Sequence, residues 1–253
     1  MKIFYFTATG NSLYIAKQFG GELYSIPQLL KSNELVFEDD VIGLVFPCYG
    51  LAAPYLVREF IARATLKSPY IFTVMTYGNT FGDSAGWFKD FAAKNNVNIN
   101  YCDGILMVDN YLPMFDIAKQ KAEDKHIPAN LARILDDIKA GKNYIRKGGL
   151  GDKLFSFAVH TYLGFKPSSS LVKDFYVTDK CNSCKTCVKV CPKDNICVPE
   201  GGKPIYSNHC EFCLACINLC PQHAIELPVE KDPARGRFKN ENINLKEIID
   251  ANN

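Results

Sequence analysis

The chain lacks a strong net charge, and this absence limits which partners it can have. Its 29 lysine and arginine residues and 27 aspartate and glutamate residues leave a formal net charge of +2 at pH 7. Proteins that bind nucleic acids or charged membrane surfaces usually carry a clear excess of basic side chains. We therefore expect no nucleic-acid partner.

Long apolar runs are missing as well. The longest uncharged stretch, "VIGLVFPCYGLAAPYLV" at Val41–Val57, is broken by Pro47, Gly50 and Pro54. It is also short of the ~20 residues that span a bilayer. The N-terminal "MKIFYFTATG" has neither the apolar length nor the small-residue cleavage site of a secretory signal. These observations predict a cytoplasmic protein with no membrane partner.

The first half of the chain alternates strand-like apolar runs with helical patterns. This alternation is typical of βαβ units around a parallel sheet. It predicts an α/β fold with a doubly wound five-stranded parallel sheet. The predicted strands are Lys2–Phe6, Glu22–Ile26, Val41–Phe46, Tyr70–Thr76 and Asn98–Val108.

The second half is organised differently. Helical patterns cover Phe115–Gly141 and Lys153–Phe165, and "KPSSS" at Lys166–Ser170 then breaks the pattern. A cysteine-rich module follows, for which we expect a small α+β fold, and a polar tail with a short helix at Asn242–Ile249 ends the chain. The predicted domains are 1–114 (α/β), 115–170 (helical connector), 171–229 (cysteine module) and 230–253 (tail).

Eight of the 11 cysteines form two copies of one pattern. Residues 181–192 read "CNSCKTCVKVCP" and residues 210–221 read "CEFCLACINLCP", so the cysteines and the final proline of the two copies are related by one constant offset. Clustered thiols in a cytosolic chain indicate metal or redox chemistry, because disulfides are rare there. Cys48, Cys102 and Cys197 lie outside the pattern, and buried thiols are the expectation for them.

The spacing C-x2-C-x2-C-x3-C-P is the one that bacterial-type ferredoxins use for 4Fe–4S clusters. In that arrangement three cysteines bind their own cluster and the fourth binds the cluster of the other half. Structural zinc also uses C-x2-C pairs but has no need of a third cysteine, so the pattern favours iron–sulfur. The module resembles the two-cluster ferredoxins over Asp179–Leu227. The first set of ligands would be Cys181, Cys184, Cys187 and Cys220, and the second set Cys191, Cys210, Cys213 and Cys216.

The N-terminal "FYFTATGNS" reads as a strand, a loop of small hydroxyl residues and a helix start, which together suit an anion. It has no G-x-x-x-x-G-K-[ST], which argues against a nucleoside triphosphate with magnesium. It has no G-x-G-x-x-G, which argues against a dinucleotide. The monophosphate of FMN fits better. The candidate phosphate-binding residues are Thr7, Thr9, Gly10, Asn11 and Ser12.

The loop "TATGNS" resembles the T-x-T-G-N-T/S phosphate loop of flavodoxins. Two further loops, Phe46–Pro54 and Thr76–Gly82, follow the third and fourth predicted strands, where that fold binds the flavin ring. The whole chain thus resembles the flavodoxin–ferredoxin fusion proteins of anaerobic bacteria and archaea. The resemblance implies that Tyr49 and Tyr77 stack on the ring of FMN. It assigns to the flavin Pro47, Tyr49, Gly50, Thr76, Tyr77, Gly78 and Asn79, with Asn110 or Tyr111 as further contacts.

Three functions follow from these parts. The first is an electron-transfer protein with one FMN and two 4Fe–4S clusters, which serves soluble redox proteins and has no catalytic side chain. The second is a reductase whose flavin reduces a small-molecule acceptor in a pocket lined by Trp87, Tyr111, Phe115 and His160. The third, a redox or oxygen sensor, would need an output surface or a DNA-binding element, and the sequence has no basic recognition helix. A homodimer stays open in all three cases.

Overall fold

The computed structural model describes residues 1–163, 175–227 and 236–253. Contacts divide the chain into two compact units. The sheet unit comprises Met1–Phe6, Ser12–Met107 and Lys125–Phe165. The cysteine unit comprises Thr7–Asn11, Val108–Asp124 and Lys166–Asn253. The domain boundaries predicted from the sequence stay predictions, and the predicted break at Lys166–Ser170 lies outside the described residues.

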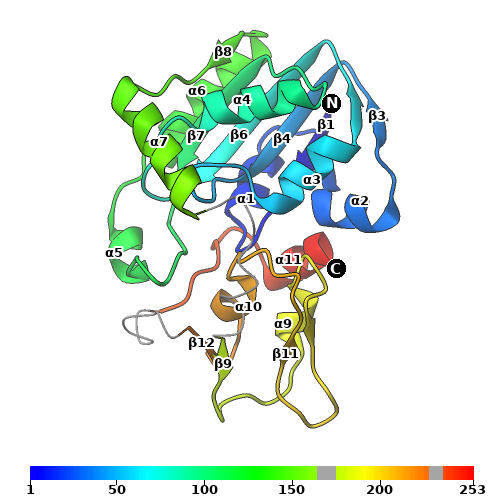
Figure 1. Cartoon of the computed structure of the whole chain (residues 1–253), viewed down its shortest axis with the longest axis vertical. Coiled ribbons are helices and arrows are strands. Elements are labelled where there is room, and N and C mark those ends of the chain that lie inside the picture. Colours follow the sequence, from blue (N-terminus) through cyan, green and yellow to red (C-terminus); the bar gives the residue numbers. More distant parts are fainter. Residues whose placement is uncertain (164–174, 228–235) are drawn as a thin grey trace. The chain divides into compact units, whose positions relative to one another are not determined.

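The sheet unit is built on one parallel sheet (Figure 1). Its strand order is β2-β1-β4-β6-β7-β8. The first five of these strands, in chain order, give the flavodoxin-like order 2-1-3-4-5. The strands are β1 (Lys2–Tyr5), β2 (Glu22–Ser25), β4 (Val41–Pro47), β6 (Tyr70–Tyr77), β7 (Tyr101–Leu106) and β8 (Tyr144–Ile145).

The predicted fold class is confirmed, but the predicted number of strands is corrected from five to six. Strand β8 contributes only two residues, which pair in parallel with Tyr101 and Cys102 of β7. It comes from the segment that the sequence predicts to be a helical connector. A separate two-stranded sheet of β3 (Val36–Glu38) and β5 (Thr65–Lys67) was not predicted either.

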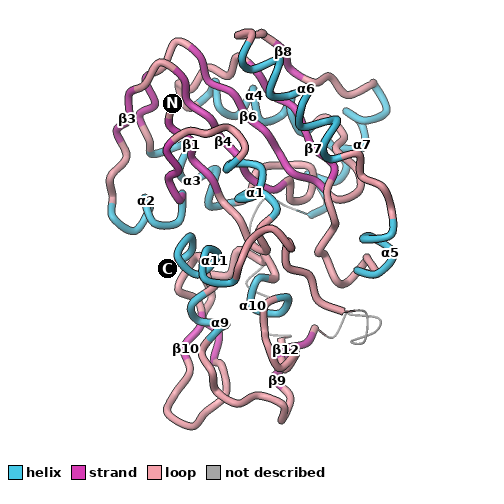
Figure 2. Tube along the Cα trace, turned by 180° about the vertical axis from the view of Figure 1, so that it is seen from behind, coloured by secondary structure: helices cyan, strands magenta, loops and turns pink. Residues whose placement is uncertain are grey.

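Helices lie on both faces of the sheet (Figures 1 and 2). This double cover explains why the central strands are apolar along their whole length rather than alternating. Phe46 and Phe72, on β4 and β6, are fully buried. Gly43 of β4 permits this packing, because a Cβ there would come within 2.4 Å of the Phe72 ring. The helices are α1 (Asn11–Lys17), α2 (Ile26–Ser32), α3 (Tyr55–Arg63), α4 (Ser84–Lys94), α6 (Ile127–Lys139) and α7 (Leu150–Leu163).

The cysteine unit repeats its secondary structure in step with its sequence. Helix α10 (Ala215–Asn218) occupies the same positions in the second copy as α9 (Thr186–Lys189) does in the first. Strands β11 and β12 correspond in the same way to β9 and β10, and each half pairs its strands with those of the other half. The remaining elements are α5 (Ile117–Ala122), β9 (Tyr176–Val177), β10 (Ile196–Cys197), β11 (Ile205–Tyr206), β12 (Ile225–Glu226) and α11 (Leu245–Asn252).

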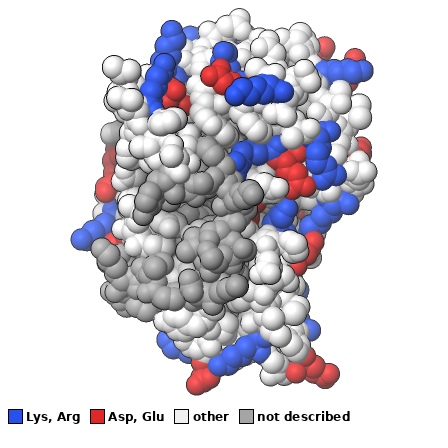
Figure 3. Space-filling view, in the orientation of Figure 1, with Lys and Arg blue, Asp and Glu red and all other residues white. Residues whose placement is uncertain are grey.

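The surface matches the near-neutral composition. Basic and acidic side chains lie interspersed on the face drawn in Figure 3. Within the described ranges of the chain, every helix is too short or too polar to cross a membrane.

Candidate functional site

The first cysteine set comes together around one small cavity in the cysteine unit. Cys181, Cys184, Cys187 and Cys220, which belong to different halves of the duplication, all line it. Cys184 is exposed, whereas Cys187 and Cys220 are buried. Burial raises the pKa of Cys187 to about 11, and the neighbouring thiols raise it further. A hydrogen bond with the Thr186 hydroxyl, at 3.4 Å, lowers the pKa of Cys184.

The second cysteine set is buried more deeply. Burial raises the pKa of Cys210 to about 11 and those of Cys213 and Cys216 well above their usual range. Cys191, from the first motif, raises the pKa of all three further. A buried thiol gives up its proton only when a cation replaces it, and iron supplies such a cation.

The backbone around both sets has the form of an iron–sulfur site. Six residues adopt left-handed conformations, and they form three pairs of equivalent positions in the two copies. Turns of this kind aim successive N–H groups into a concavity, as in many iron–sulfur sites. Main-chain N–H groups also donate to three of the thiols: Phe212 to Cys210 at 3.2 Å, Asn195 to Cys191 at 3.3 Å and Ala224 to Cys220 at 3.4 Å. The left-handed pairs are Ser183 and Phe212, Lys185 and Leu214, and Asp194 and His223.

The residues present therefore fit iron–sulfur clusters. In the described part of the chain, no three cysteine, histidine or acidic side chains converge closely enough to hold one metal ion. The cysteines around a cubane bind at its separate corners, so they do not converge on a single point.

The predicted phosphate loop belongs to the cysteine unit from Thr7 to Asn11. Gly10 has φ +104°, a conformation that other residues rarely adopt, and its N–H donates to Thr7 Oγ1 at 3.1 Å. Thr9 Oγ1 accepts a hydrogen bond from the side-chain amide of Asn110 at 2.7 Å. A threonine hydroxyl that accepts in this way keeps its own proton for a further acceptor. Both threonines are almost completely buried, and their hydroxyl protons are donors of the kind that a phosphate group accepts.

A hydrogen-bonded path connects this loop to the second cysteine motif. The main-chain carbonyl of Asn110 accepts a hydrogen bond of 3.3 Å from the side-chain amide of Asn218. Asn218 ends α10, between Cys216 and Cys220. Because Asn110 also donates to Thr9, two residues join the phosphate loop to the helix that carries Cys216.

The C-terminal segment covers the same loop. The Asn240 N–H donates to the Thr9 carbonyl at 2.8 Å, and its side chain donates to Asn11 Oδ1 at 2.9 Å. Asn252, from α11, donates to the Thr7 carbonyl at 3.1 Å. No pattern in the sequence signals these contacts, because they join opposite ends of the chain.

The predicted flavin-ring residues lie in the sheet unit, in the loops after β4 and β6. Tyr49 forms a β-bridge with Ala52, and its ring meets Phe6 edge-on at 6.4 Å. The Tyr77 ring lies 5.0 Å from that of Phe81. Pro47 is half-buried, whereas Gly50 and Asn79 are exposed. Of the remaining predicted residues, Gly78 is half-buried, and Thr76 is buried with its hydroxyl 2.8 Å from that of Ser12.

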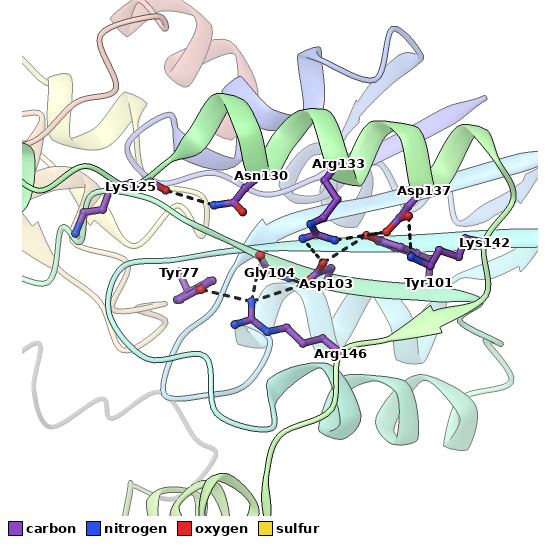
Figure 4. Close-up of polar contacts among 10 residues, drawn as sticks. All are labelled: Tyr77, Tyr101, Asp103, Gly104, Lys125, Asn130, Arg133, Asp137, Lys142 and Arg146. Atoms are coloured by element: carbon purple, nitrogen blue, oxygen red, sulfur yellow. Dashed lines mark hydrogen bonds and ion pairs between the residues drawn. The ribbon is translucent and has the colours of Figure 1, made fainter.

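Sequence reasoning missed a charged network beside Tyr77 (Figure 4). Asp103, only 1% exposed, binds Arg133 at 2.7 Å and Arg146 at 3.6 Å. The Arg146 guanidinium lies over the Tyr77 ring, 5.6 Å from its centre. The stretch "RKGGLGD", which begins at Arg146, indicates only a break between helices, so no signal in the sequence points to this role.

The four predicted pocket residues are divided equally between the two units. Trp87 and His160 are neighbours in the sheet unit, with rings 5.6 Å apart, and burial lowers the pKa of His160. Tyr111 and Phe115 belong to the cysteine unit, where Tyr111 meets the Phe212 ring at 6.2 Å.

Comparison with known proteins supports the assignment of the cysteine module. Residues 173–237 match the 4Fe-4S dicluster domain family. No curated protein sequence matches the chain.

Among solved structures, one neighbour is a protein of Bacteroides eggerthii DSM 20697, provisionally described as a flavoprotein. It is 21% identical with a TM-score of 0.33, covering 53% of this chain and 96% of that one. Another is the two-electron reduced flavodoxin of Megasphaera elsdenii, 16% identical with a TM-score of 0.30, covering 49% of this chain and 96% of that one. The fold assignment rests on the strand order of the sheet. The chain thus combines a sheet of flavodoxin-like strand order with a segment that matches the 4Fe-4S dicluster domain family, which is consistent with the predicted flavodoxin–ferredoxin fusion.

Proposed function

We propose that the chain is an electron-transfer protein that binds one FMN and two 4Fe–4S clusters. It passes electrons between these groups and on to soluble redox proteins. The observation that carries this proposal is the path from Thr9 through Asn110 to Asn218. The loop that would bind the flavin phosphate also belongs to the same compact unit as both cysteine sets.

The clusters would transfer single electrons, and FMN would accept one or two. The first cysteine set and the second cysteine set would each hold one cluster. The protein excludes water from them with an apolar core that includes Leu112, Phe175 and Ile217. Burial and hydrogen bonds to sulfur are the means by which a protein sets the potential of such clusters.

For the flavin, the chain supplies hydroxyl groups and a suitable place in the sheet. Thr7 and Thr9 would donate to the phosphate with the protons that their present hydrogen bonds leave available. The loops after β1 and β4 leave the sheet where the strand order reverses direction. In doubly wound folds, ligands bind outside the carboxyl ends of the strands at this point.

The exposed thiol of Cys184 favours a protein as the redox partner. It is the only exposed member of the two cysteine sets, all of which lie in the described part of the chain. A cluster held there would have one corner near solvent, where a partner could exchange electrons by surface contact.

The alternative, a reductase for a small molecule, draws support from α7. His160 on this helix lies 3.3 Å from the Leu51 carbonyl, and Ser156 accepts a bond from the Asp83 N–H at 3.1 Å. Helix α7 therefore packs on the loops after β4 and β6, which would place a wall beside the flavin ring.

The test is to purify the full chain without oxygen and to measure iron, sulfide, zinc and flavin per chain. We expect about eight irons with equal sulfide and one FMN. Zinc without sulfide would contradict the electron-transfer function. Iron and sulfide without flavin would show that the chain does not bind FMN. In a loaded protein, rapid turnover with a small acceptor and none with redox proteins would favour the reductase.

A further inference from the structure

The Tyr206 hydroxyl is buried in the cysteine unit and has no hydrogen-bond partner among the described residues. Its ring meets Phe175 edge-on at 5.4 Å and packs against the core that contains Cys187 and Cys216. Burial raises the pKa of Tyr206 above its usual value, and Cys216 and Cys187 raise it further, so the phenol lies beside these two sulfurs. It is therefore a buried donor whose neighbouring acceptor is the sulfur of Cys216, a proposed cluster ligand.

Asn195 presents a second donor of this kind. It is 1% exposed, and its Nδ2 has no partner within the part of the chain that the structure describes. Its main-chain N–H donates to Cys191 Sγ at 3.3 Å, and its Oδ1 accepts from the N–H of His209 at 2.7 Å. His209 precedes Cys210, so the side chain lies between two members of the second cysteine set.

The duplication provides an internal comparison. The positions of the other half that correspond to Asn195 and Tyr206 hold Ala224 and Val177. Neither can donate from its side chain. The first half also has a donor that the second half lacks. The Thr186 hydroxyl lies beside the exposed Cys184, and the equivalent position of the second half holds Ala215. The two halves therefore share a backbone but differ in their side-chain donors, and the buried donors belong to the second set.

Buried donors without acceptors are rare in folded proteins and destabilise them. Thiolate and sulfide sulfurs of an iron–sulfur cluster are acceptors, and they become more negative when the cluster is reduced. A hydrogen bond to such a sulfur therefore stabilises the reduced form and raises the potential. The effect is larger in a water-excluded core, where no solvent competes for the acceptor.

We propose that Tyr206 and Asn195 are positioning residues that donate hydrogen bonds to the cluster at the second cysteine set and raise its reduction potential. This inference rests on the proposed function, because it requires that clusters bind. It adds that the duplicated halves have diverged into two clusters with unlike surroundings, of which the second receives the hydrogen bonds of the buried donors.

The decisive variant is Tyr206→Phe in the full chain, purified without oxygen. It removes a hydroxyl that has no partner in the described structure, so we expect it to fold. A redox titration followed by electron paramagnetic resonance measures the potential of each cluster. We expect the reduced-to-oxidised ratio of the second cluster to fall about tenfold at a fixed ambient potential, equivalent to about 59 mV for one electron. The potential of the first cluster should change less, because Tyr206 is also close to Cys187 of the first set but would donate to a sulfur of the second. Cys184→Ser identifies the signal of the first cluster.

The matched control is Tyr176→Phe. Tyr176 is 46% exposed, and its hydroxyl bonds to Glu226 at 2.5 Å at the surface. Removing this hydroxyl should move neither potential. Asn195→Ala, which copies Ala224 of the other half, should lower the reduction potential of the second cluster. If Tyr206→Phe takes up no iron, the potential measured in Asn195→Ala tests the proposal.

The outcomes separate this inference from the proposed function. Full iron and sulfide content with unchanged potentials in both variants would overturn the inference and leave the electron-transfer function intact. A wild-type chain without iron and sulfide would overturn both.

Discussion

Asn110 lies between Thr9 and Asn218. It donates to the Thr9 hydroxyl at 2.7 Å and accepts from the Asn218 side chain at 3.3 Å. Thr9 belongs to the proposed flavin phosphate loop, and Asn218 lies between two proposed cluster ligands. A single asparagine thus fixes the geometry of the loop relative to the helix that carries Cys216.

Replacing Asn110 by alanine should weaken FMN binding more than cluster binding. The hydrogen bond to Thr9 disappears, and the threonine hydroxyl becomes free to rotate. A typical hydrogen bond contributes about 1 kcal/mol, so we expect the FMN dissociation constant to rise about fivefold. Flavin fluorescence during titration of the flavin-free protein measures this. Asn143→Ala, which removes a bond to Asn100 at the surface, is the control and should leave FMN affinity unchanged. Equal affinities in all three proteins would argue against the role of Asn110.

The crossed ligand sets make a specific prediction for Cys220. Its replacement by serine should remove a ligand from the first cluster, although Cys220 belongs to the second sequence motif. We expect iron to fall from about eight to about four per chain, with the loss confined to the first cluster. Iron analysis and electron paramagnetic resonance measure this. Cys197→Ser is the control, because Cys197 is exposed and lies outside both motifs. Loss of the second cluster alone would show that the sets are not crossed.

The two cysteine motifs also show how much of the site the sequence can predict. Their spacing alone predicts which eight thiols belong together, because cluster chemistry constrains that spacing strictly. The long apolar strand Val41–Phe46 is equally clear, because a strand covered on both faces must be apolar throughout. Strand β8 was missed because a segment of two residues has no periodicity.

Contacts between polar residues that are distant in the sequence could not be predicted for a different reason. Asn240 and Asn252 pack on the phosphate loop, but an asparagine in a polar tail carries no sign of its partner. For Tyr206 and Asn195 a signal did exist. They stand at positions where the two copies of the duplication differ between polar and apolar. Only the structure showed that Asn195 and the hydroxyl of Tyr206 are buried.

Asp103 should contribute strongly to the stability of the sheet unit. It is buried on β7 and paired with Arg133 and Arg146. Asp103→Ala leaves two arginines without their common acceptor, and breaking such a pair costs roughly 3 kcal/mol. Urea unfolding followed by circular dichroism measures the free energy of unfolding. Glu38→Gln is the comparison and should cost less than about 1 kcal/mol, because Glu38 pairs with Lys67 at 3.9 Å and both side chains are exposed. Similar losses of unfolding free energy in both variants would contradict the expectation that burial makes the ion pairs of Asp103 more important than a surface pair.

The pairing of Asp137 also predicts a dependence on pH. The hydrogen bond from Lys142 lowers the pKa of Asp137 below its usual value. The unfolded chain therefore binds a proton at this group more readily than the folded chain does. Its contribution to stability is complete above the ordinary aspartate pKa and is lost as the pH falls through the lowered value. Asp137→Asn should remove this part of the acid dependence, measured as the difference in unfolding free energy between pH 6 and pH 3. A wild-type slope in the variant would show that Asp137 does not contribute.

Gly10 tests whether the phosphate loop and the C-terminal segment depend on each other. A Cβ at this position would lie 2.9 Å from Asn240 Cβ and 3.1 Å from Ile243 Cβ, and φ is +104°. Gly10→Ala should therefore both strain the loop and displace the segment, at a cost of about 1–2 kcal/mol for the backbone conformation alone. We expect reduced FMN content, a lower unfolding free energy and faster proteolysis of residues 236–253, with the iron content retained. Gly151→Ala is the control, because Gly151 lies on α7 with no atom within 4 Å of its Cβ position, so alanine there should be neutral or slightly stabilising. If Gly10→Ala kept full FMN while the segment became sensitive to protease, the segment would not be needed to hold the loop in its binding conformation.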